Sequence, residues 1–162
     1  MSKTIVINGL SKESITSAIR EVREYKTWIT QKEKELRRRL AELGADVARV
    51  QFAGAQYDGT NDVSVRVDDT GSVAVIYAEG SAVAFIEFGS GAEKGYGHPQ
   101  AGSLGFGPGT YPEGKGHWDD PNGWYYTHGK KSHGNAPAMA MYDAVQRMVE
   151  EVTTIAKEVF ST

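Results

Sequence analysis

The chain has 162 residues, the size of one ordinary globular domain, and its 40% hydrophobic and 24% charged content is typical of a folded protein rather than a disordered one. A net charge of −3 gives no overall positive field for holding nucleic acid. The absence of cysteine excludes disulfides and thiolate chemistry, and no apolar stretch approaches the ~20 residues of a membrane span.

The amino-terminal segment MSKTIVINGLSKES has a short apolar run and no cleavage signal, so we expect a soluble chain made inside the cell, without membrane contact. Residues 4–7 are β-forming and precede the turn-forming pair Asn8-Gly9, which predicts a short first strand. Ser11 then fits the N-cap of a long helix that continues to about Leu43, with Gly44 as its stop. Such a helix is roughly 50 Å long.

The predicted helix is amphipathic. Its apolar residues recur at alternating steps of three and four: Ile15, Ile19, Val22, Ile29, Leu36, Leu40 and Leu43. Lys26 and Glu33 interrupt this stripe, so we expect the helix to pack on a sheet at both ends and to protrude, or meet a neighbour, in the middle. The run Arg37-Arg38-Arg39 suggests phosphate contact as an alternative, although interleaved charges at helical spacing usually form a solvated face.

From Asp46 the periodicity changes to that of β-strands. Residues 46–57, 62–67 and 72–80 have β-type patterns separated by turn signals, and the Asp69-Thr70-Gly71 turn fits a hairpin. The segment 82–91 that follows is a further strand or a short helix and strand. A second helix, with Asn135-Ala136-Pro137 at its start, is predicted over about 137–160. These elements predict a single α+β domain in which the two helices pack on an antiparallel sheet between about 46 and 88.

Between them, residues 89–134 have no clear periodicity and hold 13 of the 19 glycines and all four histidines. A segment of this length is unusual for a loop, and its aromatic residues argue against plain disorder. We therefore expect an extended loop, or arm, that becomes ordered on assembly.

The densest part of this arm is HWDDPNGWYYTHGKKSH, residues 117–133. A metal site would have as candidate ligands His117, Asp119, His128 and His133. Their spacing is irregular and the surrounding glycines provide no rigid support, so the sequence favours surface or interface histidines. We expect no catalytic site, because no serine elbow, phosphate loop or buried carboxylate pair accompanies them. The four aromatics in this stretch are Trp118, Trp124, Tyr125 and Tyr126. Such residues anchor protein interfaces, and we favour that role over a lid folded back on the sheet.

The segments AFIEFGSG (84–91), PNGWYY (121–126) and HGKKSHGNAPAMAMYDAV (128–145) resemble the tail-completion, or head–tail joining, proteins of tailed bacteriophages. The likeness covers most of the chain in the order of its elements, and its specific part comprises Glu87-Phe88-Gly89, Gly123–Tyr126 and the start of the second helix. Ser90 replaces the usual threonine, and Ala138 and Met139 follow Pro137 where the family usually has an aromatic residue.

The resemblance implies a structural virion protein of the phage neck, without catalysis or a cofactor. Its subunits would form a sixfold ring between the head connector or stopper and the tail terminator or tail tube, with DNA passing through the lumen. The Glu87-Phe88-Gly89 stretch would be a strand end at the base of the arm. The alternatives are another neck or tail subunit, such as a tail terminator or minor capsid protein, and a metal-binding module that uses His117, His128 and His133.

Overall fold

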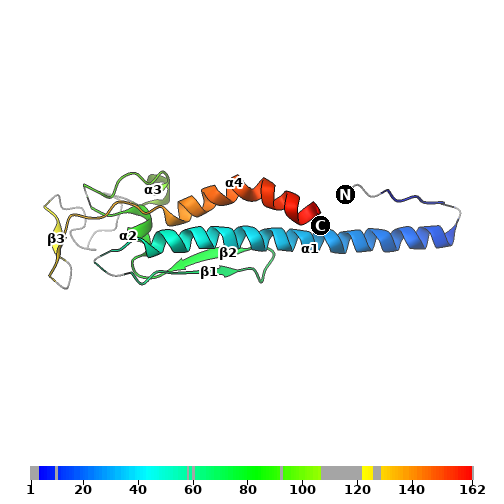
Figure 1. Ribbon diagram of the computed structural model, residues 1–162, viewed down its shortest axis with the longest axis horizontal. Helices are drawn as coiled ribbons and strands as arrows, with labels where there is room; N and C mark the ends of the chain where they lie inside the picture. Colours follow the sequence, from blue (N-terminus) through cyan, green and yellow to red (C-terminus); the bar gives the residue numbers. More distant parts are fainter. Residues whose placement is uncertain are drawn as a thin grey trace.

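A computed structural model describes residues 4–9, 11–57, 59, 61–91, 93–106, 122–125 and 129–161. Its elements in chain order are α1 (Lys12–Ala53), β1 (Ser64–Asp68), β2 (Val75–Glu79), α2 (Val83–Phe88), α3 (Ala101–Leu104), β3 (Trp124–Tyr125), β4 (Lys131–Ser132) and α4 (Ala140–Ser161). The molecule is elongated along α1, with α4 on one side of that helix and the β1–β2 hairpin on the other (Figure 1). The predicted α+β class is confirmed.

The long helix α1 begins as predicted and ends later. Ser11 is its N-cap and accepts a hydrogen bond from the Ser14 N–H at 3.2 Å. The helix continues through Gly44 and ends at Ala53, so both the predicted end near residue 43 and the predicted strand over 46–57 are wrong. Gly44 is buried, and a Cβ there would lie 2.8 Å from both the Ile76 Cδ1 and the Met148 Sδ. This glycine therefore serves close packing inside the helix and not its termination.

The hairpin of β1 and β2 is confirmed. The two strands are antiparallel, in a register that places Ser64 opposite Glu79 and Asp68 opposite Val75. Side chains alternate as predicted, with half-buried residues on one face and exposed residues on the other. On the exposed face the Arg66 guanidinium contacts the Glu79 carboxylate at 2.9 Å. The same group lies 4.0 Å from the centre of the Tyr77 ring. Residues 4–7, predicted as a strand, are extended but pair with no strand of the described chain.

Residues 83–88 form the short helix α2, so the prediction that Glu87-Phe88-Gly89 is a strand end is wrong. Gly89 ends α2 with a φ of 77°, a conformation that favours glycine. The next residue, Ser90, forms an isolated antiparallel bridge with Asn135, which brings together the two ends of the long arm.

The carboxy-terminal helix α4 begins at Ala140, three residues later than predicted. The preceding residues instead bond to α2: the N–H of Ala138 donates to the Ile86 carbonyl and that of Met139 donates to the Glu87 carbonyl. From there α4 runs antiparallel to α1, which is its main partner (Figure 1). The core between these elements consists of Ala48, Phe52, Ala82, Ile86, Ala140 and Ala144. Its many alanines let the helices approach closely. No helix among the described residues is long and apolar enough to cross a membrane.

Candidate functional site

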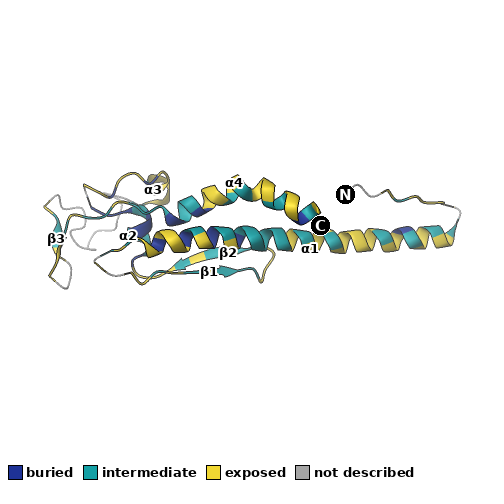
Figure 2. Ribbon diagram, in the orientation of Figure 1, coloured by how far each residue is buried: buried dark blue, intermediate teal, exposed yellow. Residues whose placement is uncertain are grey.

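The amino-terminal half of α1 extends beyond the rest of the fold and carries an uncovered apolar stripe. α4 ends where Phe160 meets Trp28, with ring centroids 5.9 Å apart, so it covers only the later part of α1 (Figure 2). Between the start of α1 and the region of this contact, five apolar side chains are exposed: Ile15 41%, Ile19 48%, Val22 53%, Tyr25 38% and, directly after Trp28, Ile29 37%. Isoleucine and valine repeated on one helix face are usually buried, so their exposure makes this face a candidate contact surface.

The same stripe continues into the fold through Leu36, Leu40 and Leu43, which are half-buried. α1 therefore packs on other elements only toward its carboxyl end and protrudes at its amino end. This corrects the expectation of packing at both ends with a protruding middle. The physical cause is the length of α4, which has 22 residues against 42 in α1.

The arginine run on α1 is neutralised within the chain. The Arg38 guanidinium bonds Glu35 and Glu42, and these hydrogen bonds raise the pKa of Arg38, with Glu35 contributing most. Arg39 reaches Glu158 on α4 at 3.1 Å. The cluster is therefore a network of ion pairs along two helices, which leaves little unpaired positive charge to hold phosphates.

The motif residue Glu87 is buried at the junction of α2, α4 and the arm. Its carboxylate accepts hydrogen bonds from the backbone N–H groups of Met141, at 2.8 Å, and Tyr142, at 3.0 Å. These are orphan donors of the first turn of α4, and Met139, which precedes that helix, has no polar side chain to cap them. Glu87 therefore acts as an N-cap supplied from α2, where its negative charge also faces the positive end of the helix dipole.

The third partner of Glu87 is His98, a buried histidine of the arm. Its Nε2 lies 3.2 Å from the Glu87 Oε1, and its Nδ1 accepts a hydrogen bond from the Gln100 N–H. Because Nδ1 is an acceptor, the proton of the neutral ring lies on Nε2, which donates to Glu87. The ring also packs edge-on against Phe88 and Tyr142. Glu87 thus both pairs with an arm residue and caps a helix.

This junction borders an open groove of about 360 Å³ between β2, α2, α3 and α4. The lining side chains are mostly apolar, and none of the described ones is a serine, cysteine or lysine that His98 would activate as a nucleophile. Both carboxylate oxygens of Glu87 are occupied by helix capping. The arrangement therefore fixes the arm to the helical body rather than presenting a reactive group.

A second carboxylate stabilises the start of α2. Asp62 accepts hydrogen bonds from the Ser81 N–H and hydroxyl, both at 2.7 Å, and from the Ala82 N–H at 3.2 Å. These hydrogen bonds, that of the Ser81 N–H first, hold the pKa of the Asp62 carboxyl below its usual value.

The predicted aromatic anchors are only partly within the described structure. Trp124 is half-buried in β3 opposite Ser132, and Tyr125 beside it is 70% exposed. The other two predicted anchors, Trp118 and Tyr126, lie outside the described residues.

Of the predicted metal ligands, only His133 belongs to the described chain, where it is exposed. His117, Asp119 and His128 lie outside it. Among the described residues no group of three or more histidine, cysteine, aspartate or glutamate side chains is placed to hold a metal ion. The functional residue that sequence reasoning missed is His98, which stands apart from the 117–133 cluster and has no periodic pattern that would mark it.

No protein-family model, curated protein or solved structure matches this chain.

Proposed function

We propose that this protein is a structural subunit of a tailed phage or prophage-like particle, where copies of it form a ring that completes the tail and joins it to the head connector. The observation that carries the proposal is the uncovered apolar stripe on the protruding half of α1. The order of elements, a long first helix, a small antiparallel sheet, a long loop and a last helix, adds support, because it is the order expected for that family.

The stripe supports assembly on energetic grounds. Complete burial of an isoleucine or valine side chain contributes roughly 1.5–3 kcal/mol, and these side chains are about half exposed. Four such side chains, together with Tyr25, provide several kcal/mol for association. This is enough for a stable contact when each subunit of a ring makes it with both of its neighbours. A stripe at one end of an elongated subunit, packed against a different surface of its neighbour, gives a head-to-tail interface that closes into a ring.

The two ends of the subunit differ, as a connecting ring requires. The β3–β4 hairpin lies at the end of the molecule opposite the amino-terminal end of α1 (Figure 1). We assign the aromatics of this hairpin, Trp124 and Tyr125, to the contact with another neck protein, either the head connector or stopper or the tail terminator or tube. The location would then be the neck of the virion, with DNA passing through the ring.

The proposal is tested by the oligomeric state of the purified chain, measured by mass photometry and viewed by negative-stain electron microscopy. We expect closed rings, and we expect the double variant Ile19→Ser/Val22→Ser to be a folded monomer. A matched control is Arg20→Ser/Glu24→Ser, which places the same residue type on the opposite, charged face of the same turns and should leave the rings intact. A wild-type chain that stays monomeric at all concentrations and with its neck partners would contradict the proposal.

A second test uses the particle itself. Loss of the gene should leave filled heads and free tails that do not join, and Trp124→Ala should give the same phenotype while the melting temperature of the subunit is nearly unchanged. The double variant His128→Ala/His133→Ala serves as the control and should join heads to tails normally. A Trp124→Ala subunit that unfolds would instead place this side chain in the lid of the fold.

A further inference from the structure

The amino-terminal segment, residues 4–7, has the character of a β-strand without a sheet. Its sequence, TIVI, is uncharged and rich in β-branched residues. In the structure it is extended, and its side chains are poorly covered, with Val6 84% and Ile7 59% exposed. We call residues 4–7 the amino-terminal segment below.

This segment cannot reach the hairpin of its own subunit. Arg37, which donates a hydrogen bond to the Gly71 carbonyl in the turn of the hairpin, is about 37 Å along the helix from Lys12 at 1.5 Å per residue. Residues 4–11 span at most about 28 Å even when fully extended. In Figure 1 the segment lies beside the protruding half of α1, beyond the end of α4 and away from the hairpin. A sheet that accepts it must therefore come from another molecule.

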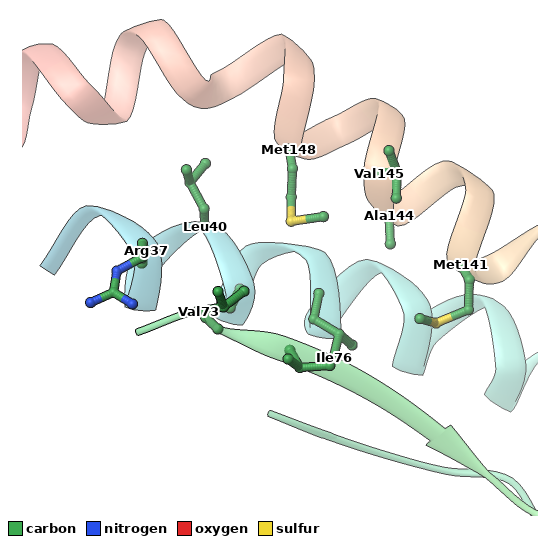
Figure 3. Close-up of a pocket in the computed structure, with 11 residues that line it drawn as sticks. Arg37, Leu40, Val73, Ile76, Met141, Ala144, Val145 and Met148 are labelled. Carbon is green, nitrogen blue, oxygen red and sulfur yellow. The ribbon is translucent and has the colours of Figure 1, made fainter. Parts of the chain in front are cut away.

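A suitable acceptor is present on the fold. An apolar groove of about 540 Å³ lies between β2 and α4, with α1 as its floor (Figure 3). Its lining includes Leu40, Val73, Val75, Val145 and Met148. Among the described residues that line it, Arg37 is the only charged one. The groove is open, and two of its valines remain well exposed, Val73 at 65% and Val145 at 48%.

The groove lies beside the start of a strand that has a free edge. Val75 and Ile76 of β2 line it together with Val73 and Ala74 before them, and no residue of β1 is among its lining residues. Within the described chain, β1 is the only strand that pairs with β2. An unpaired strand edge offers a row of backbone N–H and C=O groups to an incoming strand, and the neighbouring apolar groove accepts that strand's inward side chains.

We propose that the amino-terminal segment of one copy adds as a third strand beside β2 of a second copy, with its apolar side chains in the groove between β2 and α4. The lengths match, because residues 4–7 can pair along β2, which has five residues, about 17 Å. The chemistry also matches, because an uncharged β-forming segment meets an apolar groove. Segment and groove are different surfaces of one subunit, so the contact is head-to-tail and repeats from copy to copy. This inference rests on the proposed function only in requiring that copies of the chain assemble.

The first experiment compares two proline variants by mass photometry. Val6→Pro removes a backbone N–H and fixes φ in the middle of the added strand, and we expect it to convert the oligomer into folded monomers. Lys12→Pro is the matched control, because proline is tolerated at the first position of a helix, and it should assemble as the wild type does. Circular dichroism should show the same helix content in all three proteins.

The second experiment uses the absence of cysteine from the chain. A Val6→Cys protein is mixed with a Val73→Cys or Val75→Cys protein, and separately with a Ser64→Cys protein, before mild oxidation. Cross-strand neighbours lie within the Cα separation that a disulfide accepts, so we expect covalent dimers with a cysteine on the β2 side of the groove. Ser64 lies on β1, the other edge of the hairpin, and should give none.

The outcomes separate this inference from the proposed function. Assembly that persists in Val6→Pro would overturn the strand addition and leave the ring standing. Val6→Pro could abolish assembly while Val6→Cys crosslinks only to Ser64→Cys, or forms no crosslink to the β2 side. Either crosslinking result would place the segment elsewhere and overturn the assignment to this groove. A wild-type chain that never assembles would overturn both proposals.

Discussion

Replacing Glu87 by glutamine tests the junction between α2, α4 and the arm, because the change removes one charge and one acceptor while keeping the shape of the side chain. The Glu87 carboxylate now accepts from two backbone N–H groups of α4 and from His98, and its side chain is 6% exposed. A glutamine offers one carbonyl oxygen, and its NH₂ group is a donor that cannot satisfy another donor. At least one buried N–H therefore loses its partner.

The expected cost follows from these contacts. A buried donor left without its partner costs about 1–3 kcal/mol, and loss of a negative charge at a helix amino terminus adds up to about 1 kcal/mol. We expect Glu87→Gln to lower the free energy of unfolding by about 2–3 kcal/mol. For a domain of this size that corresponds to a melting temperature lower by roughly 5–10 °C. Glu87→Ala, which also leaves His98 without its acceptor, should cost more.

The measurement is urea unfolding followed by circular dichroism, together with hydrogen exchange. Exchange should become faster at the amides of Met141 and Tyr142, because their acceptor is the group that changes. Glu79→Gln is the matched control: it makes the same substitution at an exposed ion pair with Arg66, and its stability should stay near that of the wild type. Equal stability of the two glutamine variants, or unchanged exchange at the start of α4, would refute the capping role.

Three further predictions concern close packing and pH. Gly44→Val should destabilise the fold by about 1–3 kcal/mol in thermal unfolding, since its side chain would overlap Met148, and a wild-type melting temperature would contradict the tight contact of α1 with α4. Gly134→Ala should cost about 2 kcal/mol or more, because φ is 94° there and a Cβ would overlap the Ser90 carbonyl oxygen; urea unfolding of the variant measures this. The pKa of Asp62 is lowered in the folded state, so its contribution to stability is present above its unfolded pKa and is lost as pH falls through the folded value. Asp62→Asn should therefore melt below the wild type at pH 7, and the difference should shrink below about pH 4; a difference independent of pH would contradict the assignment.

Local sequence signals predicted several elements because the physical cause is itself local. Ser11 marks the start of α1 through a hydrogen bond to a residue three positions away. The alternation of valines around Arg66 and the turn after Asp68 predicted the β1–β2 hairpin. The apolar periodicity of the last segment predicted α4, and together these elements predicted the α+β class.

Other features were decided by contacts between distant residues. Gly44 resembles a helix stop in sequence, and only its position against Ile76 and Met148 explains why the helix continues through it. Residues 46–53 alternate as a strand would, yet burial of Ala48 and Phe52 in the core next to α2 and α4 makes them helical. Periodicity over a few residues fits either structure, so tertiary packing determines the outcome.

The candidate site also combines features that the sequence predicts with features that only the tertiary structure decides. The apolar stripe of α1 is visible in the sequence, but the sequence does not contain the fact that α4 is too short to cover it, because this depends on where the two helices meet. Glu87 stands out in the motif, whereas its partners are His98, 11 residues away, and the start of α4, 54 residues away. A sequence specifies which side chains need a buried partner or an apolar neighbour. Only the folded chain decides which distant group supplies it, because that choice depends on the packing of every element between them.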